Sequence, residues 1–296
     1  MKNNRIKYIL TALVLSLGTS VSAQITTLGS LFYQNQYLGN PAMAGVDQGF
    51  KAGLGLNRQW SEVPGAPSAQ FLTVANGSNR HGYGLNFYND KAGLLKRTRV
   101  MATYAYHIPL NAHNDQLHFG LSLGALSERL TIEETNGNPS DLAAQRFNER
   151  GAVFDGDFGA AYTSGGLNLQ VALPNLKNFL KKERFNTVNW NTFFTAASYK
   201  FDANLGGGEV GIEPKVVYRG VRGYDDVIDA GVNFTFLSNK LNATAVYHST
   251  ESVSLGMGLN IKQLNVLAMY TSGTAALRGY GAGTFDLGLS YAFKTK

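Results

Sequence analysis

The last stretch of the chain, Gly281–Phe293, reads GAGTFDLGLSYAF and decides the fold. Large apolar side chains occupy every second position of this stretch, and the positions between them are small or polar. This period of two predicts a β-strand with one apolar and one polar face. An aromatic residue at the end of such a strand is typical of the closing strand of an outer-membrane β-barrel, whose apolar face contacts lipid. The last strand of a soluble β-sandwich would alternate in the same way.

The same pattern recurs upstream. From Phe50 onward there are about fourteen strand candidates, each close to the roughly 10 residues of a tilted membrane strand. They are Phe50–Trp60, Ser68–Asn76, His81–Asn89, Arg99–Leu110, Gln116–Ser127, Ala152–Thr163, Gly166–Leu173, Trp190–Phe201, Gly208–Arg219, Val227–Leu237, Lys240–Ser249, Val253–Ile261, Gln263–Thr271 and Gly281–Phe293.

The connections between these strands distinguish the barrel from the sandwich. The even-numbered connections are short and polar, such as Gly77–Arg80 and Ser164-Gly165, whereas the odd-numbered ones include long segments, such as Glu128–Gly151 and Asp90–Thr98. Membrane barrels have short periplasmic turns and longer outer loops, and a sandwich has no reason to alternate. The sequence therefore predicts an all-β, transmembrane antiparallel β-barrel over residues 49–296, with both termini in the periplasm.

The composition agrees with a sheet whose outer face is not in water. Charged residues make up 16% of the 296 residues, against about 25% in an ordinary soluble domain. The absence of cysteine excludes disulfides and thiolate metal sites. The positive residues are scattered over expected loops, so no nucleic-acid partner is expected.

Residues 1–23 have the three parts of a cleaved signal peptide. Met1–Lys7 is basic, Tyr8–Gly18 is apolar, and Val21-Ser22-Ala23 supplies the small residues of a cleavage site. Because this segment holds three basic residues and no acidic one, its removal lowers the formal net charge from +6 to +3. The mature chain is expected to leave the inner membrane and become an integral protein of the outer membrane.

Residues 24–48 form an irregular N-terminal segment before the first strand. Pro41 removes a donor from any strand ladder, and Asn40 and Gly45 suit turns. The inward faces of the strands are rich in Gly, Ser, Thr and Asn and leave the lumen open. This segment is therefore the candidate for a plug.

No residue pattern predicts catalysis, a cofactor or a metal site. His81, His107, His113, His118 and His248 lack metal-ligand spacing. Glycine pairs such as Gly82/Gly84 lie in strands and open no helix, so they fit close packing in a barrel wall better than a phosphate loop. Asn175–Arg184 could form a short amphipathic helix that rests on the outer surface, meets a partner or packs on the rim.

Arg58-Gln59-Trp60, followed by Pro64-Gly65-Ala66-Pro67, lies at the outer end of the first strand. Trp60 is placed where an indole ring is favoured at the membrane interface, and the prolines stiffen the next loop. This motif is either an interfacial anchor with a rigid turn or the edge of a binding surface.

Several motifs together resemble the PorP/SprF family of Bacteroidota outer-membrane proteins. They are Asn40-Pro41-Ala42-Met43-Ala44-Gly45, Arg58-Gln59-Trp60, Pro64-Gly65-Ala66-Pro67, Asn89-Asp90-Lys91-Ala92-Gly93, Tyr104-Ala105-Tyr106 and Ile108-Pro109-Leu110. The resemblance runs from about Ser30 to the last strand. Met43 is a departure, since tyrosine is common at that position.

The resemblance implies a part in the type IX secretion system and, in many members, in gliding motility. The implied role is non-catalytic: the barrel holds the C-terminal domain of a large secreted surface protein, such as an adhesin, and contacts outer-membrane lipoproteins and other secretion components within the outer-membrane lipid. Candidate partner-binding or plug residues are Asn40, Pro41, Gly45, Arg58, Gln59 and Trp60. An alternative is a channel for hydrophobic small molecules, because Asn40-Pro41-Ala42 also resembles the plug motif of FadL-type transporters.

Overall fold

The computed structural model describes residues 31–33, 35–60, 65–111, 115–131, 142–177, 191–205, 208–221, 226–273 and 283–294. The predicted signal peptide and most of the predicted helix Asn175–Arg184 lie outside these residues. Fifteen strands follow three one-turn 3-10 helices, η1 (Leu31–Tyr33), η2 (Gln36–Leu38) and η3 (Pro41–Met43). The only other helix among the described residues is α2 (Leu142–Asn148).

The strands are β1 (Gly49–Gln59), β2 (Ser68–Ser78), β3 (His81–Ala92), β4 (Leu95–Pro109), β5 (Gln116–Leu130), β6 (Val153–Ser164), β7 (Leu167–Leu173), β8 (Asn191–Tyr199), β9 (Phe201–Leu205), β10 (Gly208–Val221), β11 (Val227–Phe236), β12 (Leu241–His248), β13 (Ser252–Ile261), β14 (Leu264–Thr271) and β15 (Thr284–Ala292).

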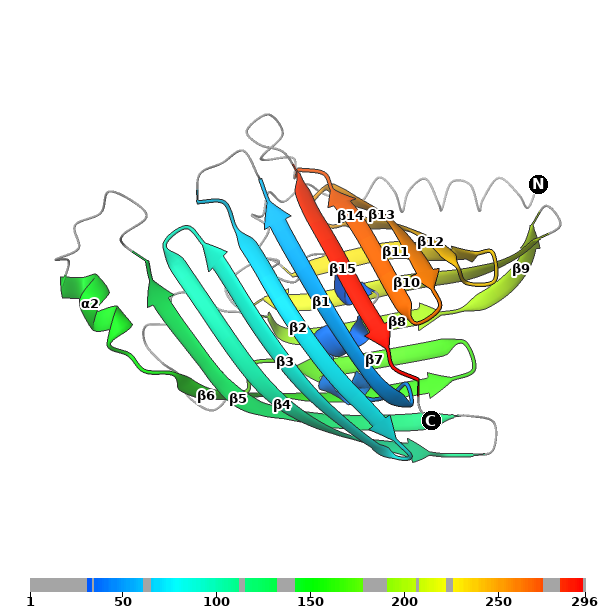
Figure 1. Cartoon of the computed structure of the whole chain (residues 1–296), viewed down its shortest axis with the longest axis horizontal. Coiled ribbons are helices and arrows are strands. Elements are labelled where there is room, and N and C mark those ends of the chain that lie inside the picture. The colour runs from blue at the N-terminus through cyan, green and yellow to red at the C-terminus, as the bar shows by residue number, and fades with distance from the viewer. Residues whose placement is uncertain are drawn as a thin grey trace, which may run out of the picture.

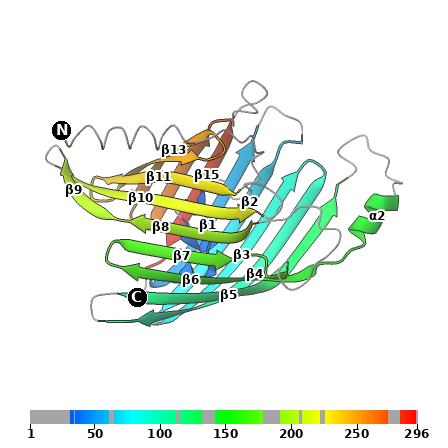
Figure 2. The same cartoon turned by 180° about the vertical axis from the view of Figure 1, so that it is seen from behind.

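These strands form one closed antiparallel barrel (Figures 1 and 2). Apart from β8 and β9, each strand pairs with its neighbour in sequence, and β1 pairs with β15 to close the sheet. β8 and β9 are two parts of a single barrel strand, because both pair with β10 in the same register. They are separated opposite Pro214, which has no amide hydrogen to donate to the ladder. The barrel therefore has fourteen strands, which confirms the predicted fold class.

The expected outer loop Asp90–Thr98 is wrong. β3 and β4 continue through it and meet at a two-residue turn, Gly93-Leu94, in which Gly93 has a φ of +57°. Polar residues hold this extension together from inside: Arg97 forms ion pairs with Asp90 (3.9 Å) and Glu128 (3.2 Å). The sequence pattern predicts that these two strands end where the alternation of apolar residues ends. In the structure the strands continue, and the inward-facing residues of the continuation are charged.

The two faces of the wall differ as a lipid-embedded barrel requires. Leucine, valine and aromatic side chains face outward and are exposed, for example Leu54, Leu85, Leu121, Leu255 and Leu287. Inward positions hold small and polar residues. Among the described residues, no helix is long and apolar enough to cross a membrane.

The barrel has two unlike ends. One end carries the connections β2–β3, β4–β5, β6–β7, β9–β10, β11–β12 and β13–β14, and is called the short-turn end; the opposite end is called the long-loop end. Residues 31–46, apart from residue 34, precede β1 and lie inside the barrel, where the dark blue ribbon in Figure 1 shows them.

Candidate functional site

The most distinctive feature of the lumen is the inner segment, defined here as residues 31–46 apart from residue 34. Its sequence dictates its shape locally. Asn40 caps η3, since its side-chain Oδ1 accepts a hydrogen bond from the amide of Ala42 at 2.9 Å. Pro41 occupies the first position of that helical turn, where its missing amide hydrogen costs nothing. The Asn-Pro-Ala motif is therefore a capped turn.

Asn40 also ties this turn to the wall. Its side chain is fully buried, and its Nδ2 donates to the carbonyl oxygen of Ala160 at 3.1 Å and to Gln170 Oε1 at 3.4 Å. One side chain thus stabilises the turn and joins it to β6 and β7.

Four inward-facing glycines, Gly82, Gly84, Gly120 and Gly159, form what we call the glycine patch on β3, β5 and β6. A Cβ atom at Gly120 would overlap the backbone of Pro41 and Ala42, and one at Gly159 would overlap the Asn40 amide. Cβ atoms at Gly82 and Gly84 would meet Ala44 and Tyr37. These glycines let the inner segment approach the strands closely, so the packing expected of glycine in a barrel wall is contact with the inner segment.

Gly45 is required for its backbone conformation as well as its size. Its φ is +67°, in the region that favours glycine. A Cβ atom there would lie 2.6 Å from the carbonyl oxygen of Asn76 and 2.7 Å from the Cα of Gly82. The turn that leads from the inner segment into β1 therefore depends on glycine.

Polar side chains attach the inner segment to several other strands. The Tyr37 hydroxyl contacts Thr103 Oγ1 at 2.7 Å, and Thr103 contacts Ser122 at 2.6 Å. Gln36 Oε1 accepts hydrogen bonds from Asn168 at 2.8 Å and from Gln170 at 2.6 Å. These contacts reach β4, β5 and β7.

The beginning of the inner segment packs against the opposite wall through apolar contacts. Leu31 packs in a buried cluster with Phe71, Leu267 and Met269. Phe32 meets Phe194 edge to face, with ring centroids 6.2 Å apart, and the guanidinium of Arg219 lies 5.3 Å from the centre of the Phe32 ring. The inner segment therefore crosses the lumen and contacts both sides of the barrel.

Cavities lie on both sides of the inner segment. On the short-turn side, two adjacent cavities of about 540 and 280 Å³ share Asn35, Gln36 and Lys51 in their lining. The larger one is lined mainly by amide, hydroxyl and lysine side chains. On the long-loop side, a cavity of about 100 Å³ lies between the inner segment, the wall of β3–β5 and Asn175.

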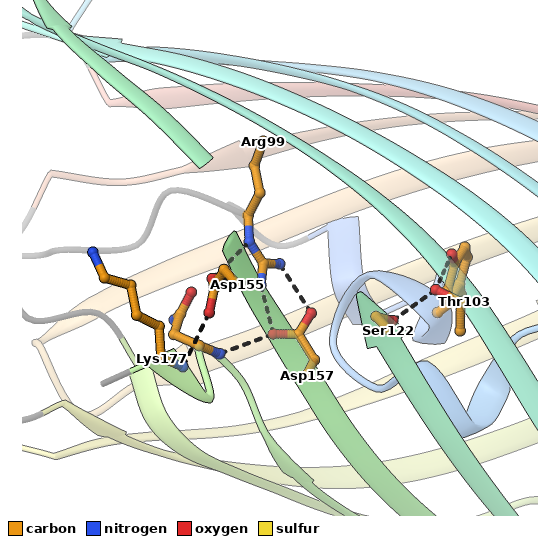
Figure 3. Close-up of polar contacts among 8 residues, drawn as sticks. Arg99, Thr103, Ser122, Asp155, Asp157 and Lys177 are labelled. Atoms are coloured by element: carbon orange, nitrogen blue, oxygen red, sulfur yellow. Dashed lines mark hydrogen bonds and ion pairs between the residues drawn. The ribbon is translucent and has the colours of Figure 1, made fainter. Parts of the chain in front are cut away.

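An ion-pair cluster closes the wall beside that smaller cavity (Figure 3). Arg99 binds Asp155 at 2.9 Å and Asp157 at 2.7 Å. The two carboxylates also accept hydrogen bonds from the backbone amides of Lys177 at 3.2 Å and Asn175 at 2.8 Å. The chain that follows β7 is thereby drawn against the inner wall.

Asp229, His248 and Ser254 are arranged like a catalytic triad. His248 Nδ1 lies 2.6 Å from Asp229 Oδ1, and His248 Nε2 lies 2.7 Å from Ser254 Oγ. Ser254 is, however, fully buried and its hydroxyl contacts Thr271 at 2.5 Å. None of the three cavities described above is lined by these residues. Arg219 pairs with Asp229 at 2.6 Å, so the group is a buried structural network. The sequence showed no sign of it, because its members lie on separate strands.

The structure separates the six candidate residues into two groups. Asn40, Pro41 and Gly45 are buried in the inner segment, whereas the Arg58-Gln59-Trp60 motif lies at the long-loop end of β1. Arg58 faces outward and is exposed, while Gln59 faces inward and donates to Asn57 at 3.4 Å. Trp60 has a φ of +42°, and its amide donates to the carbonyl of Gly283 at 3.2 Å. Within the described parts of the chain, no group of three His, Asp or Glu side chains could hold a metal ion.

Replacing Asn40 with alanine is expected to lower the free energy of unfolding by about 2 kcal/mol. Losing a cap costs about 1 kcal/mol, and losing the buried hydrogen bond to the wall costs about another 1 kcal/mol. Urea unfolding in lipid vesicles measures the loss. Asn35→Ala is the matched control, since the side chain of Asn35 donates a partly exposed hydrogen bond to Thr73 at 3.1 Å and does not cap η2. Equal losses in the two variants would contradict the special role of Asn40.

Comparisons with known proteins address the whole chain. The family model described as type IX secretion system membrane protein PorP/SprF matches residues 21–291, which include the inner segment and β1–β14. A comparison with curated proteins gave no significant match.

Several solved structures are similar to this chain at low sequence identity. The outer membrane protein Omp33 of Acinetobacter baumannii is 10% identical, with a TM-score of 0.48 and coverage of 84% of this chain and 100% of that one. The monoaromatic hydrocarbon channel CymD is 14% identical, with a TM-score of 0.45 and coverage of 94% and 96%. A mutant of the Rh. blastica porin is 10% identical, with a TM-score of 0.36 and coverage of 82% and 98%.

Proposed function

This chain belongs to the PorP/SprF family of type IX secretion system membrane proteins, and we propose that it is a non-catalytic adaptor of that system. In this proposal the outer-membrane barrel docks the C-terminal domain of a secreted surface protein, or another component of the machine, on its surface. Outer-membrane lipoproteins are further proposed partners.

The proposal rests on the position of the inner segment in the lumen. This segment crosses the lumen and contacts strands on both sides, and a cavity of about 100 Å³ lies on its long-loop side. Because the lumen is filled in this way, a partner would bind to the rim and loops of the barrel and would not pass through it. Asn40, Pro41 and Gly45 would then act as plug residues.

The long-loop rim has features that suit protein binding. α2 precedes β6 and lies at the edge of the barrel (Figure 1), and Leu142 at its start is 66% exposed. Asn148 fastens α2 to β5, since its side chain exchanges hydrogen bonds of 2.7 and 2.9 Å with the backbone of Leu130. An exposed apolar side chain on an anchored helix is a reasonable contact for a partner. Arg58, Gln59 and Trp60 lie at the same end and would support that surface.

The alternative, a channel for hydrophobic small molecules, fits the lumen less well. The larger chamber is lined by residues such as Asn233, Asn242 and Lys215, which do not suit an apolar solute. The triad-like group of Asp229, His248 and Ser254 lines none of the three cavities, so it does not support an enzymatic role.

Purification of the tagged chain from mildly solubilised outer membranes tests the adaptor. Mass spectrometry is expected to find a large surface protein or type IX components with it. Replacing residues 131–150 by a short linker is expected to reduce recovery of the partner at least tenfold. Replacing residues 111–115 at the short-turn end serves as the control and should leave recovery unchanged. A lone barrel that carries a bound hydrophobic molecule would contradict the adaptor and favour the channel.

A further inference from the structure

Four basic side chains form a row on the outside of the barrel near the long-loop end. The basic row consists of Arg58 on β1, Lys91 on β3, Lys96 on β4 and Arg129 on β5. Its members are joined by strand register: Arg58 is opposite Ser68, Ser68 is opposite Lys91, Lys91 is opposite Lys96, and Lys96 is opposite Arg129. The strands that carry them lie side by side on one face of the barrel (Figure 1).

The row lies on the surface that faces lipid. The neighbours of each member along its strand face the lumen. Gln59, Asp90 and Arg97 are buried, and Glu128 and Leu130 are partly buried. Arg58, Lys96 and Arg129 themselves are exposed. On the same outward faces, the residues four positions from Arg58, Lys91 and Lys96 are apolar and exposed. They are Leu54, Phe87 and Val100. The basic row therefore lies at the edge of the apolar surface.

The position along the strands matches the outer membrane interface. Lys96 is eight residues from Tyr104 on β4, whose ring packs with Tyr83 and whose hydroxyl lies 2.8 Å from His81 in an exposed aromatic cluster near the short-turn end. Eight residues span about 27 Å of strand, or about 20 Å along the membrane normal at a tilt of about 40°. An apolar band is about 25 Å tall with aromatic residues at its edges. Lys96 therefore lies near the opposite, outer edge of the band.

Among the described residues, the charges of Arg58, Lys96 and Arg129 are not balanced on the outward face of the wall. Like charges directly opposite each other on neighbouring strands are destabilising, and the row contains two such pairs. The two acidic residues of β1–β5, Asp90 and Glu128, are paired with Arg97 on the lumen side. In the described parts of the chain, no ion pair involves Arg58, Lys96 or Arg129. On the other side of β1, the residue opposite Arg58 is Phe285, so the row ends there.

We propose that the basic row binds the negatively charged headgroup of the phosphorylated glycolipid of the outer leaflet, lipopolysaccharide. The row runs perpendicular to the strands, and the strands are tilted from the membrane normal. The four side chains therefore lie at different depths in the membrane. Over four strand spacings of about 4.8 Å and a tilt of about 40°, the row rises by about 12 Å. A thick saccharide headgroup with anionic groups at several depths fits this slope better than the single phosphate layer of a phospholipid. This site is independent of the adaptor role, and either proposal can fail alone.

Binding of purified lipid A to the full-length protein in non-ionic detergent tests this site. The variant carries Arg58→Gln, Lys96→Gln and Arg129→Gln, while Lys91, which also interacts elsewhere, is unchanged. The matched control carries Lys51→Gln, Lys200→Gln and Lys262→Gln, which remove the same charge at the short-turn end. A basic residue near a charged lipid surface contributes roughly fivefold, so the triple variant is expected to bind about 100-fold more weakly and the control within twofold of wild type.

Two further probes separate the sources of the phosphate. Dephosphorylated lipid A is expected to bind the wild type at least tenfold more weakly than lipid A, and so is phosphatidylglycerol. Unchanged binding by the triple variant, or equal loss in the control, would overturn the site. Equal binding of phosphatidylglycerol would overturn the assignment to a glycolipid. The three single variants, each checked for heat-dependent migration of the folded barrel, keep the test valid if the triple variant folds poorly.

Discussion

Deletion of residues 31–46 is expected to turn the barrel into an open channel. The inner segment crosses the lumen, and the wall that it contacts on β3, β5 and β6 carries the glycine patch, which has no side chains to fill the space that the deletion leaves. Barrels of eight strands are filled by their own side chains, whereas those of 16–18 strands leave an aqueous channel. A barrel of fourteen strands without its inner segment should therefore conduct. Single-channel recording in planar bilayers is expected to show at least a tenfold rise in conductance.

Two controls make this deletion informative. Replacing residues 132–141 of the outer loop by a flexible linker of equal length should leave conductance at the wild-type level. A protease site placed between Val46 and Gln48, combined with Asn40→Ala, allows the segment to be cut after the barrel has folded. If both the deleted and the cut barrels stay closed, another part of the chain blocks the lumen and the plug assignment is wrong.

Replacing Asp229 with leucine is expected to lower the free energy of unfolding by about 3–5 kcal/mol. Asp229 is fully buried and neutralises Arg219, which lies 2.6 Å away, while its other oxygen contacts His248. The substitution leaves Arg219 buried without its counter-ion, and removing one partner of a buried pair has a cost of this size. Urea unfolding in vesicles, followed by tryptophan fluorescence, gives the value.

The double variant Asp229→Leu/Arg219→Leu distinguishes two explanations of this loss of stability. One is that Arg219 is left buried without a counter-ion, and the other is that one favourable contact is lost. Removing both charges should restore a large part of the stability, because apolar groups of similar volume often replace a buried pair at little cost. A double variant as unstable as the sum of its single variants would contradict this explanation.

The strands could be predicted from sequence because lipid and lumen impose opposite polarity on successive residues. The predicted starts of β2, β3, β5 and β10 coincide with those in the structure. The prediction was wrong between Asp90 and Thr98, where a charged inward face continues the strands past the apolar band. The alternation of apolar and polar residues predicts only the part of a strand that lies in the membrane. It does not predict the part that extends beyond the membrane.

The interior could not be predicted in the same way. Asn40 was recognised as a turn residue, but its partners Ala160 and Gln170 are 120 and 130 residues away in sequence. Gly120 and Gly159, which contact the inner segment, look no different in sequence from glycines elsewhere in the wall. The network of Arg219, Asp229 and His248 likewise comes from three strands and has no local spacing. Such contacts depend on barrel register, which a single sequence does not fix.

The pairing of β1 with β15 has a consequence for a truncated chain. Nine residue pairs across this seam join the first strand to the last one, so the sheet cannot close without β15. Leu31 of the inner segment packs against Leu267 and Met269, which lie on β14, next to that seam. A chain truncated before β15 keeps an unpaired edge on β1. Closure of the sheet is thereby coupled to enclosure of the inner segment, and a barrel without its last strand exposes an edge that can pair with another chain.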